Sequence, residues 1–160
     1  MSENSTSGRD KSLRRHLLAL LDGAWAHIDL ASAVEGFPPG LMHRAVPGLD
    51  HTAWDLVYHL HAAQRDILNY LRQGRDYESP SYPEGYWPRG EEKSAGTEAW
   101  KSTVESCFRD LEELRGIVEN EDHDLLAPLF PGTEHTLLRE ILVLADHSSY
   151  HIGQLVDELK

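Results

Sequence analysis

The chain has 160 residues, 40% hydrophobic and 26% charged, a composition typical of one globular domain. Fifteen basic residues stand against 27 acidic ones, and the formal net charge of -12 argues against nucleic acid and anionic membrane surfaces as partners. No apolar run has the length of a membrane span, and the single cysteine, Cys107, rules out an internal disulfide. We therefore expect a cytoplasmic protein that binds neither nucleic acid nor membrane.

The N-terminal segment, residues 1–9, is polar and lacks the basic-then-apolar order of a signal peptide. We interpret it as a disordered leader before a single domain over residues 10–160. Hydrophobic residues then recur with helical spacing in four long segments, and nothing shows the alternation of a strand. These predicted helices cover residues 11–36, 51–74, 97–120 and 136–160. Four amphipathic helices of this length predict an all-α fold, a four-helix bundle.

Several residues mark the ends of these helices. Pro38 and Pro39 follow the first helix and prevent its continuation. Thr52 and Asp55 have the spacing of a capping box at the start of the second, and Thr97 is the expected N-cap of the third. Gly74 is a plausible C-cap of the second helix.

A long irregular segment, residues 75–96, separates the second and third predicted helices. It is rich in proline, glycine and aromatic residues, and loops of this length in compact domains are often functional. Its aromatic side chains, Tyr82, Tyr86 and Trp87, either form a lid or pocket wall over a site or pin the loop to the bundle by burying their rings.

The stretch "ADHSSYHIGQLV" near the end of the chain contains His147 and His151, four residues apart. Spacing alone decides little, because ten histidines would give about 0.6 such pairs by chance. A helical wheel places both rings beside the apolar face of the fourth helix. His59 lies at the margin of the apolar face of the second helix. Three imidazoles that meet between helices would suit Zn, Ni or Fe. Partly buried histidines with ordinary hydrogen bonds are the alternative.

The second helix "HTAWDLVYHLHAAQRDIL", the loop motif "YPEGYWP" and the terminal "TLLREILVLADHSSYHIGQLV" together resemble the DinB family of four-helix proteins. This resemblance covers the chain from the first helix to the end. In that family a histidine on helix two and an H-x-x-x-H pair on helix four bind a divalent metal. The resemblance thus implies His59, His147 and His151 as metal ligands. It also implies a small thiol cofactor such as mycothiol or bacillithiol in the metal-dependent members.

Ser148 follows His147, so the glutamate of an H-E-x-x-H metalloprotease motif is missing. The nearest acidic candidates for a catalytic role are Glu140 and Asp55, each with a solvated helix charge or cap as the alternative. Gln154 is a candidate for orienting a ligand or substrate, with simple packing as the alternative.

Candidates for cofactor binding are His27, Tyr86 and Trp87. Two functions follow from the sequence. The first is a metal-dependent enzyme on an unidentified small molecule, resembling a thiol-dependent transferase or a hydrolase. The second is a non-catalytic metal-binding or stress-associated bundle. In both cases we expect a homodimer.

Overall fold

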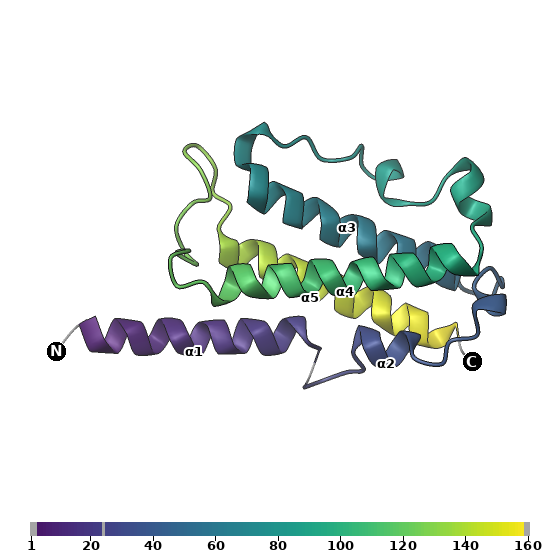
Figure 1. The fold of residues 1–160 in the computed structure, drawn as a ribbon, viewed down its shortest axis with the longest axis horizontal. Coiled ribbons are helices and arrows are strands. Elements are labelled where there is room, and N and C mark those ends of the chain that lie inside the picture. Colours follow the sequence, from purple (N-terminus) through teal and green to yellow (C-terminus); the bar gives the residue numbers. More distant parts are fainter. Residues whose placement is uncertain (1–2, 24, 159–160) are drawn as a thin grey trace.

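A computed structural model describes residues 3–23 and 25–158, with the side chains of residues 3–7 left aside. Within this part of the chain the structure contains five α-helices and no β-strand (Figure 1). The α-helices are α1 (Glu3–Leu21), α2 (Leu30–Val34), α3 (Ala53–Gln73), α4 (Thr97–Glu119) and α5 (Leu137–Asp157), joined by four short 3-10 helices. The four long helices lie along one axis as a bundle, so the predicted all-α fold is confirmed (Figure 1).

The prediction of one continuous helix over residues 11–36 is wrong. This segment is divided into α1 and α2, and the chain turns between Asp22 and Asp29. Gly23 adopts a left-handed φ of 68°, and a Cβ there would lie 3.2 Å from the Cα of Asp29. Asp29 then begins α2, where its side chain accepts a hydrogen bond from the Ser32 amide. Helix α1 begins at Glu3 and therefore includes residues 3–9, where the sequence predicts a disordered leader; residues 1–2 lie outside the described part.

The ends of the other helices follow the sequence closely. Thr52 and Asp55 form the predicted capping box at the start of α3, and Gly74 is its C-cap. The prediction for α4 is wrong by one residue, because Gly96 is the N-cap and Thr97 is already helical. No side chain caps this end of α4.

Apolar side chains fill the bundle in two groups, one toward each end. One group surrounds Trp54 and Trp100, together with residues of α2 and the end of α5. The other surrounds Leu68 and Leu114 and includes residues of α1 and the start of α5. Helix α3 packs against both α4 and α5 and thus forms the centre of the bundle.

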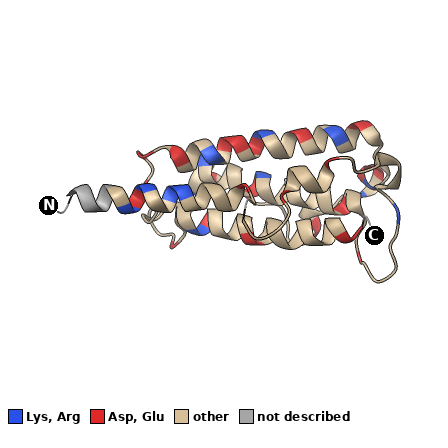
Figure 2. Ribbon diagram, turned by 90° about the horizontal axis from the view of Figure 1, so that it is seen from below, with Lys and Arg blue, Asp and Glu red and all other residues tan. Residues whose placement is uncertain are grey.

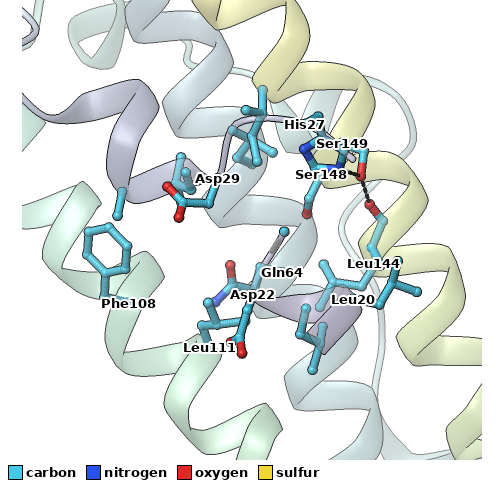
Figure 3. A pocket seen from close by; sticks show the side chains of 17 residues that line it. Leu20, Asp22, His27, Asp29, Gln64, Phe108, Leu111, Leu144, Ser148 and Ser149 are labelled. Atoms are coloured by element: carbon cyan, nitrogen blue, oxygen red, sulfur yellow. Dashed lines mark hydrogen bonds between the residues drawn. The ribbon is translucent and has the colours of Figure 1, made fainter. Parts of the chain in front are cut away.

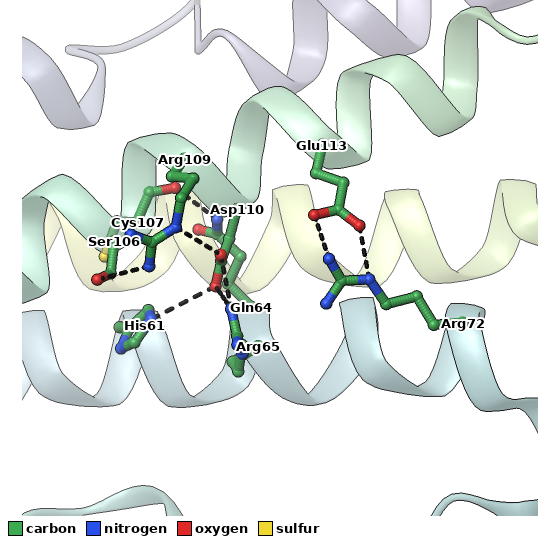
Figure 4. A network of polar contacts seen from close by, with 9 residues as sticks. All are labelled: His61, Gln64, Arg65, Arg72, Ser106, Cys107, Arg109, Asp110 and Glu113. Carbon is green, nitrogen blue, oxygen red and sulfur yellow. Dashed lines mark hydrogen bonds and ion pairs between the residues drawn. The ribbon is translucent and has the colours of Figure 1, made fainter.

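Polar contacts tie α3 to α4 along their common face (Figure 4). The Asp110 carboxylate on α4 is almost fully buried, and Arg65 Nη1 donates hydrogen bonds to its two oxygens over 2.8 and 3.0 Å. His61 Nε2 lies 3.4 Å from the same carboxylate. His61 therefore turns away from His59, and the sequence "HLH" is not a chelating pair.

A buried arginine, Arg14, lies at the C-terminal end of α4. Arg14 of α1 is 5% exposed, and its guanidinium donates hydrogen bonds to the carbonyls of Val118, Asn120 and His123 at 2.6–2.9 Å. The last carbonyls of a helix have no partner within the helix and carry partial negative charge. Arg14 therefore joins α1 to the C-terminal end of α4 and to the turn that follows it.

Charges on the surface are mixed in sign. In the view of Figure 2, basic residues are interspersed with acidic ones along the helices. None of the helices in the described part of the chain combines the length and apolarity that a membrane crossing requires.

Candidate metal centre

Three histidines from two helices meet between α3 and α5. His59 comes from the N-terminal third of α3, and His147 and His151 occupy successive turns of α5. One nitrogen from each ring lies within 4.8 Å of the other two. The structure therefore brings together the three residues that the sequence singled out, and such a group could hold a metal ion.

Hydrogen bonds fix which nitrogen of each ring faces the centre. The Tyr86 carbonyl can only accept, so His59 Nδ1, at 3.1 Å, carries the proton and donates it. His151 Nδ1 is held in the same way, 2.7 Å from Gln154 Oε1. Both rings therefore present an unprotonated Nε2, the form that ligates a metal.

His147 completes the centre differently. Its Nε2 lies 2.9 Å from His59 Nε2. Because His59 Nε2 has no proton to give, His147 Nε2 is the donor of this bond. The other nitrogen of His147, Nδ1, is buried and has no hydrogen-bond partner in the described structure. A metal ion would thus require the proton of His147 to move from Nε2 to Nδ1.

The geometry and electrostatics of the three rings fit a divalent cation. Imidazole nitrogens bonded to one ion at about 2.0–2.1 Å in tetrahedral geometry lie about 3.3–3.4 Å apart; the observed nitrogens lie 2.9 Å apart for His59 and His147, and all three lie within 4.8 Å of one another. Burial, together with the neighbouring histidines, lowers the pKa of His59 and of His147 to about 4. Burial also lowers the pKa of His151. All three rings are therefore neutral at pH 7, as metal ligands must be.

The loop over residues 75–96 covers one side of the centre. The indole of Trp87 stacks on the His59 ring, with 3.9 Å between centroids and an interplanar angle of 1°. His51 stacks on Trp87 as well. Tyr86 is anchored through its hydroxyl, which donates to Asp66 Oδ2 over 2.9 Å. Tyr82 is 86% exposed, so Tyr86 and Trp87 pin the loop while Tyr82 stays at the surface.

A cavity of about 350 Å³ adjoins the centre between α3, α5 and this loop. His147 lines it, and so do Tyr86, Asp66 and Glu140. Burial and then the hydrogen bond to Asp66 raise the pKa of Tyr86 to about 12, so its hydroxyl stays a donor. Asp66 Oδ1 is buried without a hydrogen-bond partner, and no described cation forms an ion pair with Asp66.

The other residues that the sequence predicted for the site lie at different positions in the structure. Glu140 lines the cavity, where it is 5% exposed and pairs with Arg139 Nη1 at 2.5 Å and His135 Nδ1 at 3.2 Å. Asp55 serves the capping box of α3 and does not line the cavity. His27 does not join the three histidines.

Asp66 was missed by the sequence reasoning. It lies seven residues after His59 with Ala63 between them, so the three share one helix face. That spacing is a signal, but the contact that gives Asp66 its place, the Tyr86 hydroxyl, comes from a loop twenty residues away.

A family model described as the DinB superfamily matches residues 20–155. This match covers most of the chain, and the chain therefore belongs to the DinB superfamily, as the sequence motifs indicated. Neither the curated proteins nor the solved structures contain a significant match.

Proposed function

We propose that the protein is a metal-dependent enzyme acting on a small molecule, with His59, His147 and His151 as the ligands of one divalent ion. The observation that carries the proposal is that His147 belongs both to the histidine cluster and to the wall of the adjoining cavity. A purely structural metal site has four protein ligands and is closed. Three histidine ligands would leave coordination positions for water or a substrate, and His147 lines the adjoining cavity.

The cavity suits a metabolite-sized substrate. Its volume of about 350 Å³ is at the lower end of the range for small-molecule sites. A metal ion held by three neutral imidazoles keeps its positive charge, acts as a Lewis acid and lowers the pKa of bound water towards about 7. Reactions open to such a site are hydrolysis and, by family resemblance, transfer that uses a small thiol such as mycothiol or bacillithiol.

The protein's own side chains would bind and orient the substrate. Asp66 is a carboxylate with no cationic partner, held in position by the Tyr86 hydroxyl. It is the acceptor for an N–H or O–H group of the substrate, while Glu140 is already engaged by Arg139 and His135. Tyr86 and Trp87 would exclude water from the side that the loop covers.

Metal analysis of protein purified without a histidine tag tests the ligand set. We expect about one equivalent of zinc, nickel or iron per chain, and its loss in His59→Ala and in His147→Ala. His61→Ala is the matched control, because His61 lies on α3 two residues from His59 but contacts Asp110. Full metal content in both His59→Ala and His147→Ala would refute the ligand assignment.

Activity requires a second measurement. Metal-loaded protein is assayed for hydrolysis of simple esters and amides, and for conjugation of electrophiles by mycothiol or bacillithiol. We expect turnover that His147→Ala abolishes, and that Asp66→Asn lowers without loss of metal. Metal binding without turnover by any loaded form would instead favour the non-catalytic metal-binding bundle.

A further inference from the structure

A second cavity, of about 260 Å³, lies where α1 and α2 separate (Figure 3). None of the three clustered histidines lines it. It is bounded by Leu60 of α3 and Ile152 of α5, which follow His59 and His151 in sequence and point about 100° away from them around their helices. The second cavity is thus distinct from the one beside the histidines.

The walls of this cavity are mainly apolar. Large apolar side chains from five helices contribute to them, among them Leu20, Leu30, Leu60, Phe108, Leu144 and Ile152. An apolar protein cavity of about 150 Å³ is known to accept benzene. The observed volume therefore leaves room for an apolar molecule larger than one aromatic ring.

One buried polar group faces this apolar space. Gln64 is 6% exposed and lines the cavity, and its Nε2 donates a hydrogen bond of 2.7 Å to the Cys107 carbonyl. A carbonyl accepts only, so this bond fixes which end of the amide is nitrogen. Gln64 Oε1 is left on the other side, directed into the cavity and free of any hydrogen bond within the described structure (Figure 3).

The polar groups at the rim are occupied by other contacts. Asp22 pairs with Arg115, and Asp29 caps α2 through the Ser32 amide. His27 Nε2 lies 2.9 Å from Ser149 Oγ, and its Nδ1 lies 2.8 Å from its neighbour's carbonyl. The hydroxyl of Ser148 also lines the cavity, from a half-buried position. The amide oxygen of Gln64 is therefore the acceptor that a buried polar side chain of the lining offers in the cavity interior.

We infer that the cavity between α1 and α2 is a second binding site, for a small and mainly apolar molecule that carries one N–H or O–H donor. The apolar body replaces water against the leucine and phenylalanine side chains, and the donor reaches Gln64 Oε1. A buried acceptor left without a donor is unfavourable, so the site selects for the donor as well as for size. This inference does not depend on the metal centre.

Indole and 1-methylindole are the probes, because they share the ring system but only indole has an N–H donor. Dissociation constants of both are measured on the full chain by titration of its ¹H–¹⁵N spectrum. We expect indole to bind about three- to tenfold more tightly, the value of one neutral hydrogen bond. The affected signals should come from α2 and the turn before it.

Two variants test the role of the acceptor and the location of the binding site separately. In Gln64→Leu the preference for indole should fall to about one, because the acceptor is gone. Ala31→Phe places a ring in the cavity from an exposed position of α2, and both probes should stop binding while Gln64 stays unchanged. Ala31→Phe also tests the inference if Gln64→Leu fails to fold, since Gln64→Leu removes the hydrogen bond that joins the α3 side chain to the Cys107 carbonyl of α4.

Three results would overturn the inference: no binding of either probe to the parent protein, an undiminished preference for indole in Gln64→Leu, or unchanged binding in Ala31→Phe. Metal content measured in the same samples should stay at the parent value in both variants. Failure of the metal-centre proposal would thus leave the indole titration unaffected.

Discussion

Gln154 offers the sharpest test of how the histidine cluster is held in place. Its side-chain oxygen accepts the 2.7 Å hydrogen bond from His151 Nδ1, and no other described residue does so. Replacement by alanine frees the ring to rotate and removes the acceptor that keeps the proton on Nδ1. Loss of such an outer partner typically lowers metal affinity about 10- to 100-fold. This corresponds to about 1.4–2.8 kcal/mol.

The assay is competition for Zn²⁺ between metal-free protein and a chromogenic chelator at pH 7. Gln154→Glu keeps an acceptor facing His151 and should stay close to the parent affinity. Tyr150→Phe is a matched control, because it removes only the exposed 3.3 Å contact at the other end of the Gln154 amide. If Gln154→Ala binds zinc within twofold of the parent protein, the hydrogen bond does not position His151 and the reasoning fails.

The remaining predictions concern stability, pH and thiol reactivity. Arg14→Met should lower the free energy of unfolding by about 3–4 kcal/mol, because three carbonyls at the end of α4 and in the turn after it lose a charged donor. By calorimetry this is a fall in Tm of about 6–16 °C. The metal-free protein should lose stability as the pH falls from about 6.5 to about 4, measured by urea unfolding. In that range the unfolded imidazoles bind protons that the folded His59 and His147, with their pKa lowered to about 4, do not. Cys107 should resist a disulfide reagent in the folded protein, because it is 1% exposed and burial raises its pKa to about 12.

Each of these has its own control. Arg15→Met changes an exposed neighbour of Arg14 and should alter stability by less than about 0.5 kcal/mol; equal effects of the two variants would contradict the role of Arg14. Combined replacement of His59 and His147 by asparagine should flatten the pH dependence, and an unchanged slope would assign it to other groups. Cys107 should react at once in urea, whereas rapid labelling of the folded protein would show that the thiol is accessible.

The sequence was sufficient for the long helices because their signals are local. The capping box of Thr52 and Asp55 and the C-cap at Gly74 depend on residues a few positions apart, and all are present in α3. The histidines were predicted from helix faces and family motifs together. A wheel can place a ring beside a core, and the structure then shows which rings meet.

The parts that sequence could not supply depend on contacts between distant segments. Apolar residues keep their helical spacing through the turn at Gly23, so periodicity alone does not reveal the break between α1 and α2. The cavity at that break involves residues of five helices. Likewise, the role of Gln64 depends on a carbonyl 43 residues away in sequence.

The His59 ring contacts both the other histidines and the loop over residues 75–96, and it therefore couples the histidine cluster to that loop. Its Nε2 faces the cluster, while Nδ1 donates to the Tyr86 carbonyl and the ring face carries Trp87. An ion that immobilises this ring would also immobilise the loop that rests on it. If binding of the ion favours the ordered loop by some factor, thermodynamic reciprocity requires that ordering of the loop raise the affinity for the ion by the same factor. A molecule seated beneath Tyr86 would therefore be a positive effector of metal retention, whether or not it reacts.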